Sequence, residues 1–429
     1  MKILFIYPSF QRHSEAHPEL RQWVPMNEYL GSPSLGLAMM AAVTPDDWQL
    51  EFRDDRLSPA DVPTDADLVA FSFFTPAATR ALELAKYFRE SGKRTVAGGI
   101  FPTMMTELCE AHFDAVVVGE GEPVWHQVLA DAKKGVLQKR YKASAAQSID
   151  HLPQPRMDLY LAKEAGTFKP DDYPVQLSRG CPLNCQACVL PTSMTTHLRH
   201  FSIAHVVEQL QVLAKSGKRA CLTEDTSWFP GANAKQLTTL FQAIVDHGAP
   251  ATISYIGISM PMILASSTAT LSLAKKAGVD MFYLVGGFDP ITKGAFTGNN
   301  AKALERAYLA IKKSHDVGIE PYTSFLLGNE DDDEGTVDRM LEFAAKSEIT
   351  KAEFAIFTPY PGTPAWTRLA SEGRIIDHRW SKYNDANCVF QPAKMTPDQL
   401  TQGYLRLWRD FYKNKNLGHL TVAERTIQF

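Results

Sequence analysis

Three cysteines lie close together near the middle of the chain, in the stretch RGCPLNCQACVLP at 179–191. They are Cys181, Cys185 and Cys188, and thiols at this density are typical of metal ligands or redox pairs. A zinc site needs four ligands, usually as two pairs, and a redox dithiol needs only CxxC, which would leave Cys181 without a role. An iron–sulfur cubane has four irons, and three thiolates in one loop hold three of them. The spacing therefore indicates an iron–sulfur site with one iron open to a substrate or cofactor.

The chain has six cysteines in all, and the three others are scattered: Cys109, Cys221 and Cys388. Each is predicted to be a buried small apolar side chain rather than a fourth ligand. His197 and His200 follow the cysteines and remain an alternative pair of zinc ligands, although they do not account for the three-residue gap between the first two cysteines. Six cysteines in 429 residues are too few for a disulfide scaffold, which predicts a reducing compartment.

The composition predicts a folded protein of two or three domains, with 45% hydrophobic and 21% charged residues in 429. A formal net charge of -4 provides no excess positive field for a phosphate backbone, so nucleic acid is not expected as a partner. No apolar stretch has the length of a membrane-spanning helix, and MKILFIYPSF is too short for a signal peptide. We therefore expect a cytoplasmic location and no integral membrane segment.

The N-terminal third alternates between strand and helix patterns, which predicts a doubly wound, Rossmann-like α/β domain over 1–140. Strands are expected at 2–8, 50–55, 68–74, 94–100 and 115–121, with a helix at 76–92. Ligands of such domains bind at the carboxyl ends of the strands. Small, hydroxyl and other turn residues follow three of these strands: Ser72, Phe73, Thr75, Gly98, Gly99, Gly119, Glu120 and Gly121.

A second series begins after a proline-rich segment, which is predicted to be a linker over 141–172. Six strand–helix units follow over 173–372 and predict a partial (β/α)6 barrel of the TIM type. The cysteines come directly after the first strand of this series, so they are expected at the catalytic face of the barrel. The segment 373–429 is rich in aromatic residues and is expected to pack on the barrel or the domain junction.

The stretch CPLNCQAC resembles the CxxxCxxC motif of the radical S-adenosylmethionine (SAM) enzymes, which stands after the first strand of a six-unit barrel. The resemblance implies a 4Fe-4S cluster on the three cysteines and a SAM molecule that chelates the open iron. TEDTSW at 223–228 and LVGGFDP at 284–290 resemble further motifs of that family, although the fourth strand lacks its small-x-Glu-Ser pattern. The residue before the third cysteine, often aromatic in the family, is an alanine. The implied SAM contacts are Ala187, Glu224, Asp225, Gly286 and Gly287.

The N-terminal domain resembles the cobalamin-binding domain of the B12-dependent branch of these enzymes. The similar stretches are GSPSLGL at 31–37, FSFFT at 71–75, GGIFPT at 98–103 and GEGEPVW at 119–125. DxHxxG, the motif of other B12 proteins whose histidine binds cobalt, is absent, as is usual in this branch. The implied cobalamin contacts are Ser34, Leu35, Ser72, Phe73, Thr75, Gly98, Gly99, Phe101, Gly119, Glu120 and Gly121.

The two resemblances imply a cobalamin-dependent radical SAM methyltransferase. A 5'-deoxyadenosyl radical would remove a hydrogen atom from an unactivated carbon, which then takes a methyl group from methylcobalamin. The alternatives are a cyclisation, ring contraction or oxidation with the same cofactors, or a non-catalytic ligand or redox sensor. The implied partners are a small-molecule or peptide substrate and a low-potential electron donor such as flavodoxin or ferredoxin.

No catalytic side chain is identified by the sequence, because the cofactors carry the chemistry. Tyr255, Tyr322 and Tyr360, near the ends of barrel strands, are candidates for facing the substrate, with core packing as the alternative. The early segment 11–29, which contains His13 and His17, is too long and polar for a tight turn. It is expected either to line the corrin or substrate site or to be a surface loop.

Overall fold

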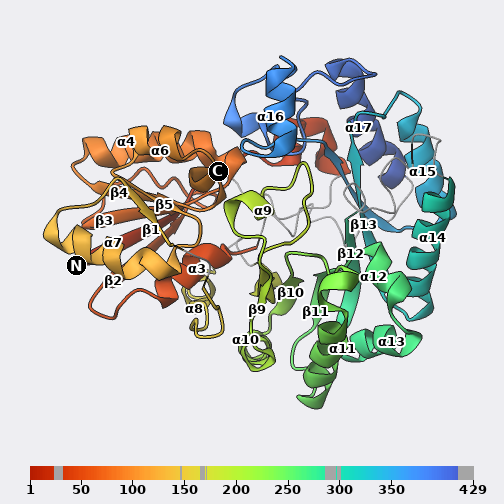
Figure 1. Cartoon of the computed structure of the whole chain (residues 1–429), viewed down its shortest axis with the longest axis horizontal. Coiled ribbons are helices and arrows are strands. Elements are labelled where there is room, and N and C mark those ends of the chain that lie inside the picture. Colours follow the sequence, from red (N-terminus) through yellow and green to blue (C-terminus); the bar gives the residue numbers. More distant parts are fainter. Residues whose placement is uncertain are drawn as a thin grey trace.

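The computed structural model describes residues 1–23, 32–144, 147–164, 170, 172–285, 296 and 301–413. Two α/β units lie side by side, the first in red to orange and the second in green to blue (Figure 1). The first unit contains a six-stranded sheet in the order β2-β1-β3-β4-β5-β6, and its pairings are all parallel. Its strands are β1 (Lys2–Tyr7), β2 (Gln49–Asp54), β3 (Leu68–Ser72), β4 (Arg94–Gly98), β5 (Ala115–Val118) and β6 (Arg140–Lys142).

Helices cover both faces of this sheet, because alternate side chains of each strand point to opposite sides. Phe5 packs on the side of α3 (Leu35–Ala42) and α7 (Glu122–Lys134), where its ring lies 6.1 Å from that of Trp125. Phe71 packs on the other side, in the core with α4 (Ala78–Glu90) and α6 (Thr106–His112). The two helix layers lie above and below the sheet in Figure 1. This arrangement confirms the doubly wound fold.

The strand β6 and the short helix α8 (Asp158–Leu161) were not predicted from the sequence. Tyr141 of β6 is 3% exposed and stands opposite Val117 of β5, so this strand completes the edge of the first sheet. Three residues are too few to show a strand period, and tertiary pairing alone defines the strand. The segment predicted as a linker therefore begins with a strand that belongs to the first sheet.

The second unit is built around six parallel strands in the order β14-β13-β12-β11-β10-β7. The strands are β7 (Asp172–Gln176), β10 (Arg219–Thr223), β11 (Ile253–Gly257), β12 (Val279–Val285), β13 (Glu320–Leu327) and β14 (Lys351–Ile356). The helices are α10 (Ile203–Lys215), α11 (Pro230–Asp246), α12 (Met260–Ala265), α13 (Thr268–Lys276), α14 (Ala301–Asp316), α15 (Thr336–Lys346) and α16 (Pro364–Ser371). Because neighbouring strands follow the chain order, the sheet has the topology of a partial barrel, as predicted.

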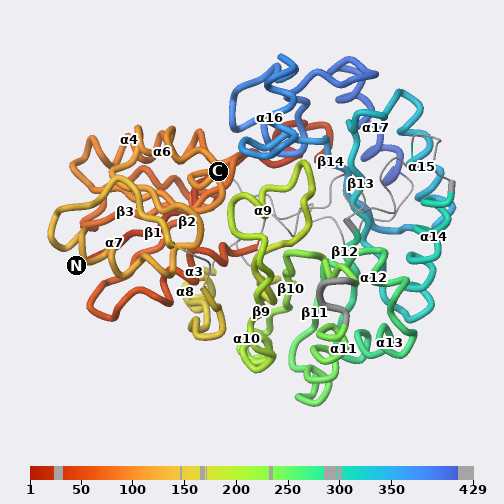
Figure 2. Tube along the Cα trace, viewed as in Figure 1, coloured from red at the N-terminus to blue at the C-terminus, as the bar shows by residue number. Residues whose placement is uncertain are grey.

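The cysteines lie on a loop whose base is a small ladder. Strand β8 (Ser178–Arg179) pairs antiparallel with β9 (Arg199–His200), and the loop of residues 180–198 includes the short helix α9 (Leu190–Ser193). In the ribbon and in the trace, α9 lies between the two units (Figure 1, Figure 2). We call residues 180–198 the cysteine loop.

The C-terminal segment contains a long helix, α17 (Pro397–Tyr412), which the sequence analysis did not predict. Thr396 and Gln399 form a capping box at its start, and its apolar face packs on β14 and α15. The short helix η4 (Trp380–Lys382) packs on the first unit, where the ring of Trp380 lies 5.4 Å from that of Phe101. The segment thus contacts both units.

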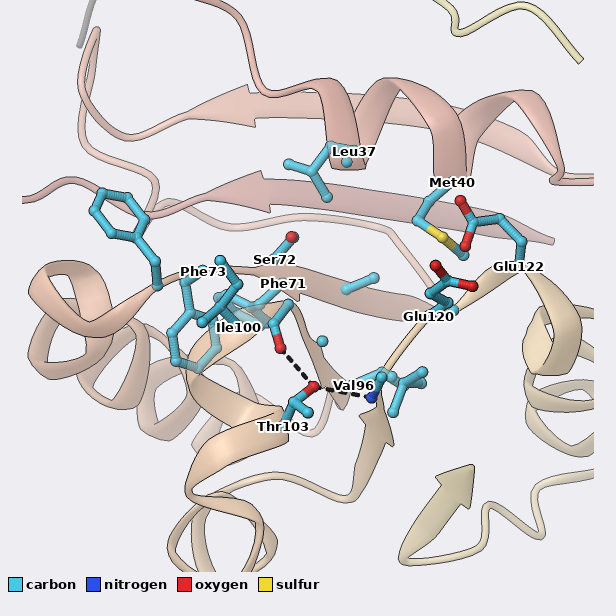
Figure 3. Close-up of a pocket in the computed structure, with 18 of the residues that line it drawn as sticks. Leu37, Met40, Phe71, Ser72, Phe73, Val96, Ile100, Thr103, Glu120 and Glu122 are labelled. Atoms are coloured by element: carbon cyan, nitrogen blue, oxygen red, sulfur yellow. Dashed lines mark hydrogen bonds between the residues drawn. The ribbon is translucent and has the colours of Figure 1, made fainter. Parts of the chain in front are cut away.

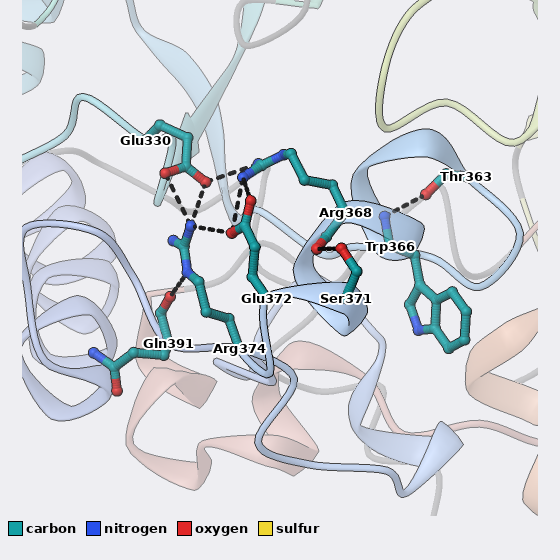
Figure 4. A network of polar contacts seen from close by, with 8 residues as sticks. All are labelled: Glu330, Thr363, Trp366, Arg368, Ser371, Glu372, Arg374 and Gln391. Carbon is teal, nitrogen blue, oxygen red and sulfur yellow. Dashed lines mark hydrogen bonds and ion pairs between the residues drawn. The ribbon is translucent and has the colours of Figure 1, made fainter.

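A polar network fixes the start of this C-terminal segment to the barrel (Figure 4). Glu330, which follows β13, accepts hydrogen bonds from Arg368 at 2.8 Å and Arg374 at 3.1 Å. Both arginines also pair with Glu372. These groups are partly exposed, so each pair contributes little to stability and the network mainly sets the direction of the chain. Within the described residues, no helix is both apolar and long enough to cross a membrane.

Candidate active site

The cysteine loop has a fixed backbone. The Cys181 N–H donates to Thr195 O at 3.0 Å, which closes the loop near its base, and the Cys188 N–H donates to Cys185 O at 3.2 Å, which makes a tight turn. Gly180 has φ = 92°, and a Cβ at this position would run into the backbone of His197. Only glycine fits this close approach between the two ends of the loop.

The three cysteines lie in surroundings that disfavour free thiolates, so that a cationic iron–sulfur core would be needed to keep them ionised. Cys181 is 5% exposed, and Cys185 and Cys188 are half-buried. Burial, with the nearby thiols and Asp225 adding negative charge, raises the pKa of Cys181 to about 11, and burial raises the pKa of Cys188. Within the described residues, no three His, Cys, Asp or Glu side chains converge as the ligands of one metal ion do. The arrangement is compatible with a cubane, in which each thiolate binds its own iron.

The other three cysteines lie elsewhere in the fold. Cys109 is on α6 and Cys221 on β10, both at most 1% exposed, and burial raises the pKa of each thiol to about 12. Cys388 is in the C-terminal segment and donates to Phe390 O at 3.0 Å. None of the three is on the cysteine loop. Cys109 and Cys221 are buried as predicted, whereas Cys388 is only partly buried.

Two carboxylates at the end of β10 connect this strand to the cysteine loop. Glu224 is 8% exposed and accepts hydrogen bonds from Ser178 Oγ at 3.0 Å and from the Thr226 and Trp228 N–H groups at 2.7 and 3.0 Å. Asp225 Oδ2 accepts from the Gly180 N–H at 2.8 Å. Both residues were predicted to contact SAM. Here they shape the turn after β10 and hold the first residue of the cysteine loop against it.

The other predicted SAM contacts are placed as follows. Ala187 is 6% exposed within the cysteine loop, and the carbonyl of its neighbour Gln186 accepts from the Ala365 N–H at the start of α16, at 2.9 Å. Gly286 and Gly287 lie outside the described residues. The loop is therefore held on its barrel side by β10 and on its far side by α16, while the individual SAM contacts stay predictions.

A pocket of about 280 Å³ opens at the carboxyl ends of the strands of the first sheet (Figure 3). Seven of the predicted cobalamin contacts line it: Ser72, Phe73, Gly98, Gly99, Gly119, Glu120 and Gly121. The lining also includes Gly36 and Leu37 of α3, within the stretch that resembles the cobalamin-binding domain. These residues come from three consecutive strand ends, which is where the doubly wound fold places a ligand.

The glycines of this pocket hold the backbone close to neighbouring segments. A Cβ on Gly99, where φ is +100°, would lie 2.8 Å from Phe73 O, and a Cβ on Gly121 would lie 3.0 Å from Met40 Sδ. Thr103 Oγ1 donates to Gly99 O at 2.8 Å and accepts from the Gly119 N–H at 2.9 Å, as Figure 3 shows. A larger side chain at Gly99 would displace the neighbouring strand end, whereas the end of the Met40 side chain could move away from one at Gly121.

Four predicted cobalamin contacts do not line the pocket. Ser34 caps α3, and its backbone N–H donates to Tyr160 Oη at 3.0 Å, while Leu35 begins that helix. Thr75 is 3% exposed at the start of the short helix η2 (Thr75–Ala77), and Phe101 is fully buried. Of the four, Phe101 packs on the lining residue Phe73, with their ring centroids 5.9 Å apart.

Several pocket residues were not assigned from the sequence: Met40, Thr103, Glu122, Arg179, Ser193 and Met194. Thr103 ends the GGIFPT stretch, and its position one helical turn after Gly99 is the signal that could have found it. Arg179, Ser193 and Met194 come from the cysteine loop and its base, and no local pattern in the sequence indicates that they reach the first unit. The pocket of the N-terminal sheet is thus closed by the loop that carries the cysteines.

Inside the barrel, tyrosines stand on three neighbouring strands: Tyr255, Tyr283 and Tyr322. The ring of Tyr283 lies 6.0 Å from that of Tyr255 and 5.3 Å from that of Tyr322. Tyr322 Oη donates to Glu353 Oε2 at 3.1 Å, and Tyr283 also donates to Glu353. All four side chains are half-buried, whereas the opposite faces of the strands are buried against the helices. The lumen therefore presents aromatic and carboxylate surface.

The described part of the early segment, residues 11–23, contains the short helices α1 (His13–Ala16) and η1 (Pro18–Gln22) and lies against the C-terminal segment. We call it the early loop. His17 Nε2 is 2.7 Å from Ala386 O, and Tyr404 Oη of α17 is 2.9 Å from His13 Nδ1. Tyr360, the third tyrosine predicted to face substrate, donates to Asp385 Oδ1 at 2.8 Å. The described part of the early loop therefore packs on protein, and its contact with a corrin or substrate stays a prediction.

Residues 30–129 match the family model of the B12 binding domain, and residues 363–421 match a domain of unknown function, DUF4070. The bacteriochlorophyllide d C-12(1)-methyltransferase of Chlorobaculum tepidum is 26% identical over 89% of this chain and 83% of its own length. The anaerobic magnesium-protoporphyrin IX monomethyl ester cyclase of Rubrivivax gelatinosus is 24% identical over 97% of this chain and 78% of its own length. These similarities extend across both units.

Among solved structures, the chain is similar to the radical SAM methyltransferase TsrM from Kitasatospora setae. The form with tryptophan and aza-SAM bound has a TM-score of 0.63 at 16% identity, over 86% of this chain and 76% of that chain. The form with cobalamin and a [4Fe-4S] cluster has a TM-score of 0.61 at 15% identity, over 86% of this chain and 78% of that chain. At this identity the likeness shows a common fold.

Three observations point to the same family. The N-terminal unit matches the B12 binding domain and has a pocket at its strand ends. The cysteine motif lies after the first strand of a partial barrel. The sequence relatives align along most of the chain, and the solved structures share its fold over 86% of its residues. The chain is therefore similar to cobalamin-dependent radical SAM enzymes in its cysteine motif, its N-terminal domain and its fold.

Proposed function

We propose that this enzyme is a C-methyltransferase that uses a 4Fe-4S cluster, SAM and cobalamin to methylate an unactivated carbon of a small molecule. When bound, the cluster supplies the electron that cleaves SAM, and the corrin supplies the methyl group. The relatives named as bacteriochlorophyllide methyltransferases, and the fold shared with TsrM, support this activity.

One observation carries the proposal. The pocket at the strand ends of the B12 domain is lined by Gly99 and Gly119 from one side and by Arg179, Ser193 and Met194 of the cysteine loop and its base from the other. A corrin in this pocket would therefore adjoin the loop that holds the cluster. Methyl transfer to a carbon radical requires such proximity, because the radical must meet the methyl donor before it reacts elsewhere.

The protein's own residues bind, orient and shield. Cys181, Cys185 and Cys188 would hold the cluster, and Asp225 fixes the start of their loop through the Gly180 N–H. The apolar lining of the pocket, which includes Phe5, Leu37 and Phe73 among others, excludes water from the corrin face. The main role of the chain would therefore be to position the cofactors and to keep water out of the site, rather than to supply acid–base chemistry.

The substrate is proposed to enter the barrel lumen, where Tyr255, Tyr283 and Tyr322 offer flat aromatic surface and Glu353 a carboxylate. These side chains are half-buried and lie within the barrel, so they are accessible to a ligand. A low-potential electron donor such as flavodoxin or ferredoxin is proposed to reduce the cluster, in a cytoplasmic setting.

The B12 part of the proposal is tested by titrating the full chain with hydroxocobalamin and reading protein-bound visible absorbance after gel filtration. We expect stoichiometric uptake by the wild-type chain and loss of uptake in Gly99→Ala, whose Cβ would collide with the Phe73 backbone. Gly92→Ala is the control: its φ of +74° also strains an alanine, by about 1 kcal/mol, but its Cβ meets nothing within 4 Å. Absence of uptake by the wild-type chain would refute a B12-dependent function.

A second candidate function is a cyclisation or oxidation with the same cofactors, favoured by the similarity to the anaerobic cyclase along nearly the whole chain. Incubating the reconstituted enzyme with methyl-labelled SAM, a reductant and a panel of tetrapyrrole and aromatic acceptors separates the two. Labelled product with 5'-deoxyadenosine supports methyl transfer. An altered but unlabelled product supports the second candidate.

A further inference from the structure

The base of the cysteine loop carries two arginines that face each other. In the β8–β9 ladder, Arg179 stands directly opposite Arg199, and both side chains are 8% exposed. Two like charges in cross-strand positions repel each other, and buried guanidinium groups require partners. The ladder would therefore be unfavourable unless carboxylates from elsewhere neutralised it.

Both partners come from the B12 domain. Glu120, which follows β5, accepts from Arg199 Nη1 at 2.8 Å and Nη2 at 2.5 Å, a two-point contact. Glu122, the first residue of α7, lies 2.8 Å from Arg179 Nη1. The glutamates are 11% and 9% exposed and stand side by side at the edge of the pocket in Figure 3. We call these four residues, Arg179, Arg199, Glu120 and Glu122, the interdomain clamp.

The clamp belongs to both cofactor sites. Glu120, Glu122 and Arg179 line the pocket at the strand ends of the B12 domain, and Arg179 is two residues before Cys181. Arg179 also donates through Nε to Gln176 Oε1 at 3.0 Å, which ties it to the end of the first barrel strand. Glu120 was predicted to contact cobalamin, but both of its carboxylate oxygens are engaged by Arg199.

Stability alone does not explain this network. Removing four charges from water is costly, and apolar side chains of similar volume in place of buried ion pairs give comparable or higher stability. Paired charges instead restrict how the two side chains can be oriented, because a planar guanidinium and a carboxylate bind in only a few relative orientations. Because the glutamates belong to the first unit and the arginines to the base of the cysteine loop, the clamp fixes the orientation of these two parts relative to each other.

We propose that the clamp is a positioning device that fixes the cysteine loop against the cobalamin pocket and so sets the separation of the two metal cofactors. This role rests on the proposed function, since it matters only if both cofactors are bound. None of the four residues is assigned a chemical step. Loosening the clamp is expected to leave each cofactor bound while the cluster-to-corrin distance becomes variable.

The test uses the holoenzyme and electron paramagnetic resonance of cob(II)alamin in the presence of the reduced cluster. The dipolar interaction between the two unpaired spins reports their separation directly. We expect a single well-defined interaction in the wild-type protein and a weakened, spread interaction in Arg199→Met, with unchanged iron and cobalamin content, because Arg199 is not part of the pocket lining. An unchanged interaction in Arg199→Met would overturn the proposal.

A matched control is available inside the B12 domain. Arg56 makes an equally buried, two-point contact with Asp54, at 2.9 and 2.6 Å, but both residues belong to the first unit. Arg56→Met should lower the midpoint of unfolding without spreading the dipolar interaction. If Arg56→Met spreads it as much as Arg199→Met does, the effect is general destabilisation and the clamp has no special role.

A second measurement keeps the test decisive if Arg199→Met does not fold. Arg199→Lys keeps the charge but cannot make the two-point contact, so it should fold and still spread the interaction. In the cofactor-free protein, the shifts in unfolding midpoint for Arg199→Lys and Glu120→Gln should be non-additive, and additive shifts would contradict direct pairing. A wild-type chain that binds no cobalamin would instead refute the proposed function, so the two failures are distinguishable.

Discussion

At the scale of single residues, the sequence predicted candidate cofactor contacts but not the hydrogen bonds that these residues make. The spacing of Cys181, Cys185 and Cys188 was sufficient to indicate an open iron–sulfur site, because ligand spacing is local information. Glu120 shows the limit. Its position after a strand predicted a ligand contact, but its partner Arg199 is 79 residues away, and no periodicity reveals such a pair.

Glu224 is a similar case. Its predicted contact with SAM came from the resemblance of TEDTSW to a motif of the radical SAM family. In the structure its carboxylate oxygens hold Ser178 Oγ and the N–H groups of Thr226 and Trp228. A buried carboxylate with several donors organises the turn, and that role is visible only once the donors are placed.

The first prediction concerns the cluster ligands. Cys185→Ala should lose the visible absorbance of the reconstituted cluster and reduce 5'-deoxyadenosine formation to background, because a cubane needs its thiolates. Cys388→Ala is the control, since Cys388 is in the C-terminal segment and its thiol bonds a backbone carbonyl there. Retention of absorbance and deoxyadenosine formation in Cys185→Ala would show that the ligand assignment is wrong.

At the scale of elements, the alternation of strand and helix patterns predicted both sheets. The pattern was strong because buried parallel strands are continuously apolar and their helices have a clear 3.6-residue period. The elements that were not predicted, such as β6 and α17, lacked such a clear pattern of apolar residues. Strand β6 has three residues, and the many aromatic residues of α17 were interpreted as a mixed tail although Thr396, Pro397 and Gln399 form a helix-start signal.

The second prediction tests that signal. Thr396→Ala removes the side chain that accepts from the Gln399 N–H at 3.1 Å and should destabilise the protein by about 1 kcal/mol, seen as a lower midpoint of thermal unfolding. Thr401→Ala, in the same helix, loses only a bond to Pro397 O and should change the midpoint little. Equal shifts in the two variants would mean that the cap does not stabilise α17.

At the scale of the whole molecule, the mutual arrangement of the two units was beyond sequence reasoning. It depends on contacts between distant residues, such as the Phe101 and Trp380 rings and the close approach of Met104 to Gly362. The early loop and α17, at opposite ends of the chain, also meet through His13 and Tyr404. These contacts join the B12 domain, the barrel and the C-terminal segment around the cysteine loop.

The third prediction concerns pH. Burial lowers the pKa of His13 from 6.5 to about 4, so the folded protein disfavours its protonated form. The unfolded chain takes up a proton on His13 near pH 6.5, whereas the folded protein does so only near pH 4. The free energy of unfolding therefore falls as the pH drops from 6.5 towards 4, by about 3 kcal/mol in total. Asp385 acts in the opposite sense, because burial raises its pKa from 3.8 to about 6. Protonation of its carboxyl group therefore increases the free energy of unfolding as the pH falls from 6 towards 3.8.

The effect of His13 is isolated by comparing variants rather than by the wild-type curve alone. His13→Gln keeps a polar side chain near Tyr404 and should lose less stability than the wild-type protein between pH 6.5 and 4. Denaturant unfolding of the cofactor-free chain at several pH values measures this difference. Parallel pH curves for the two proteins would show that His13 does not stay neutral in the folded state.

The central claim is that this chain carries a methyl group from SAM on cobalamin, and one measurement tests it without knowledge of the substrate. The reduced, cobalamin-loaded enzyme is incubated with methyl-labelled SAM, quenched in the dark, and its corrin is separated by chromatography, with heat-denatured enzyme as the control. The account predicts labelled methylcobalamin well above the control. Formation of 5'-deoxyadenosine with no label on the corrin would contradict it.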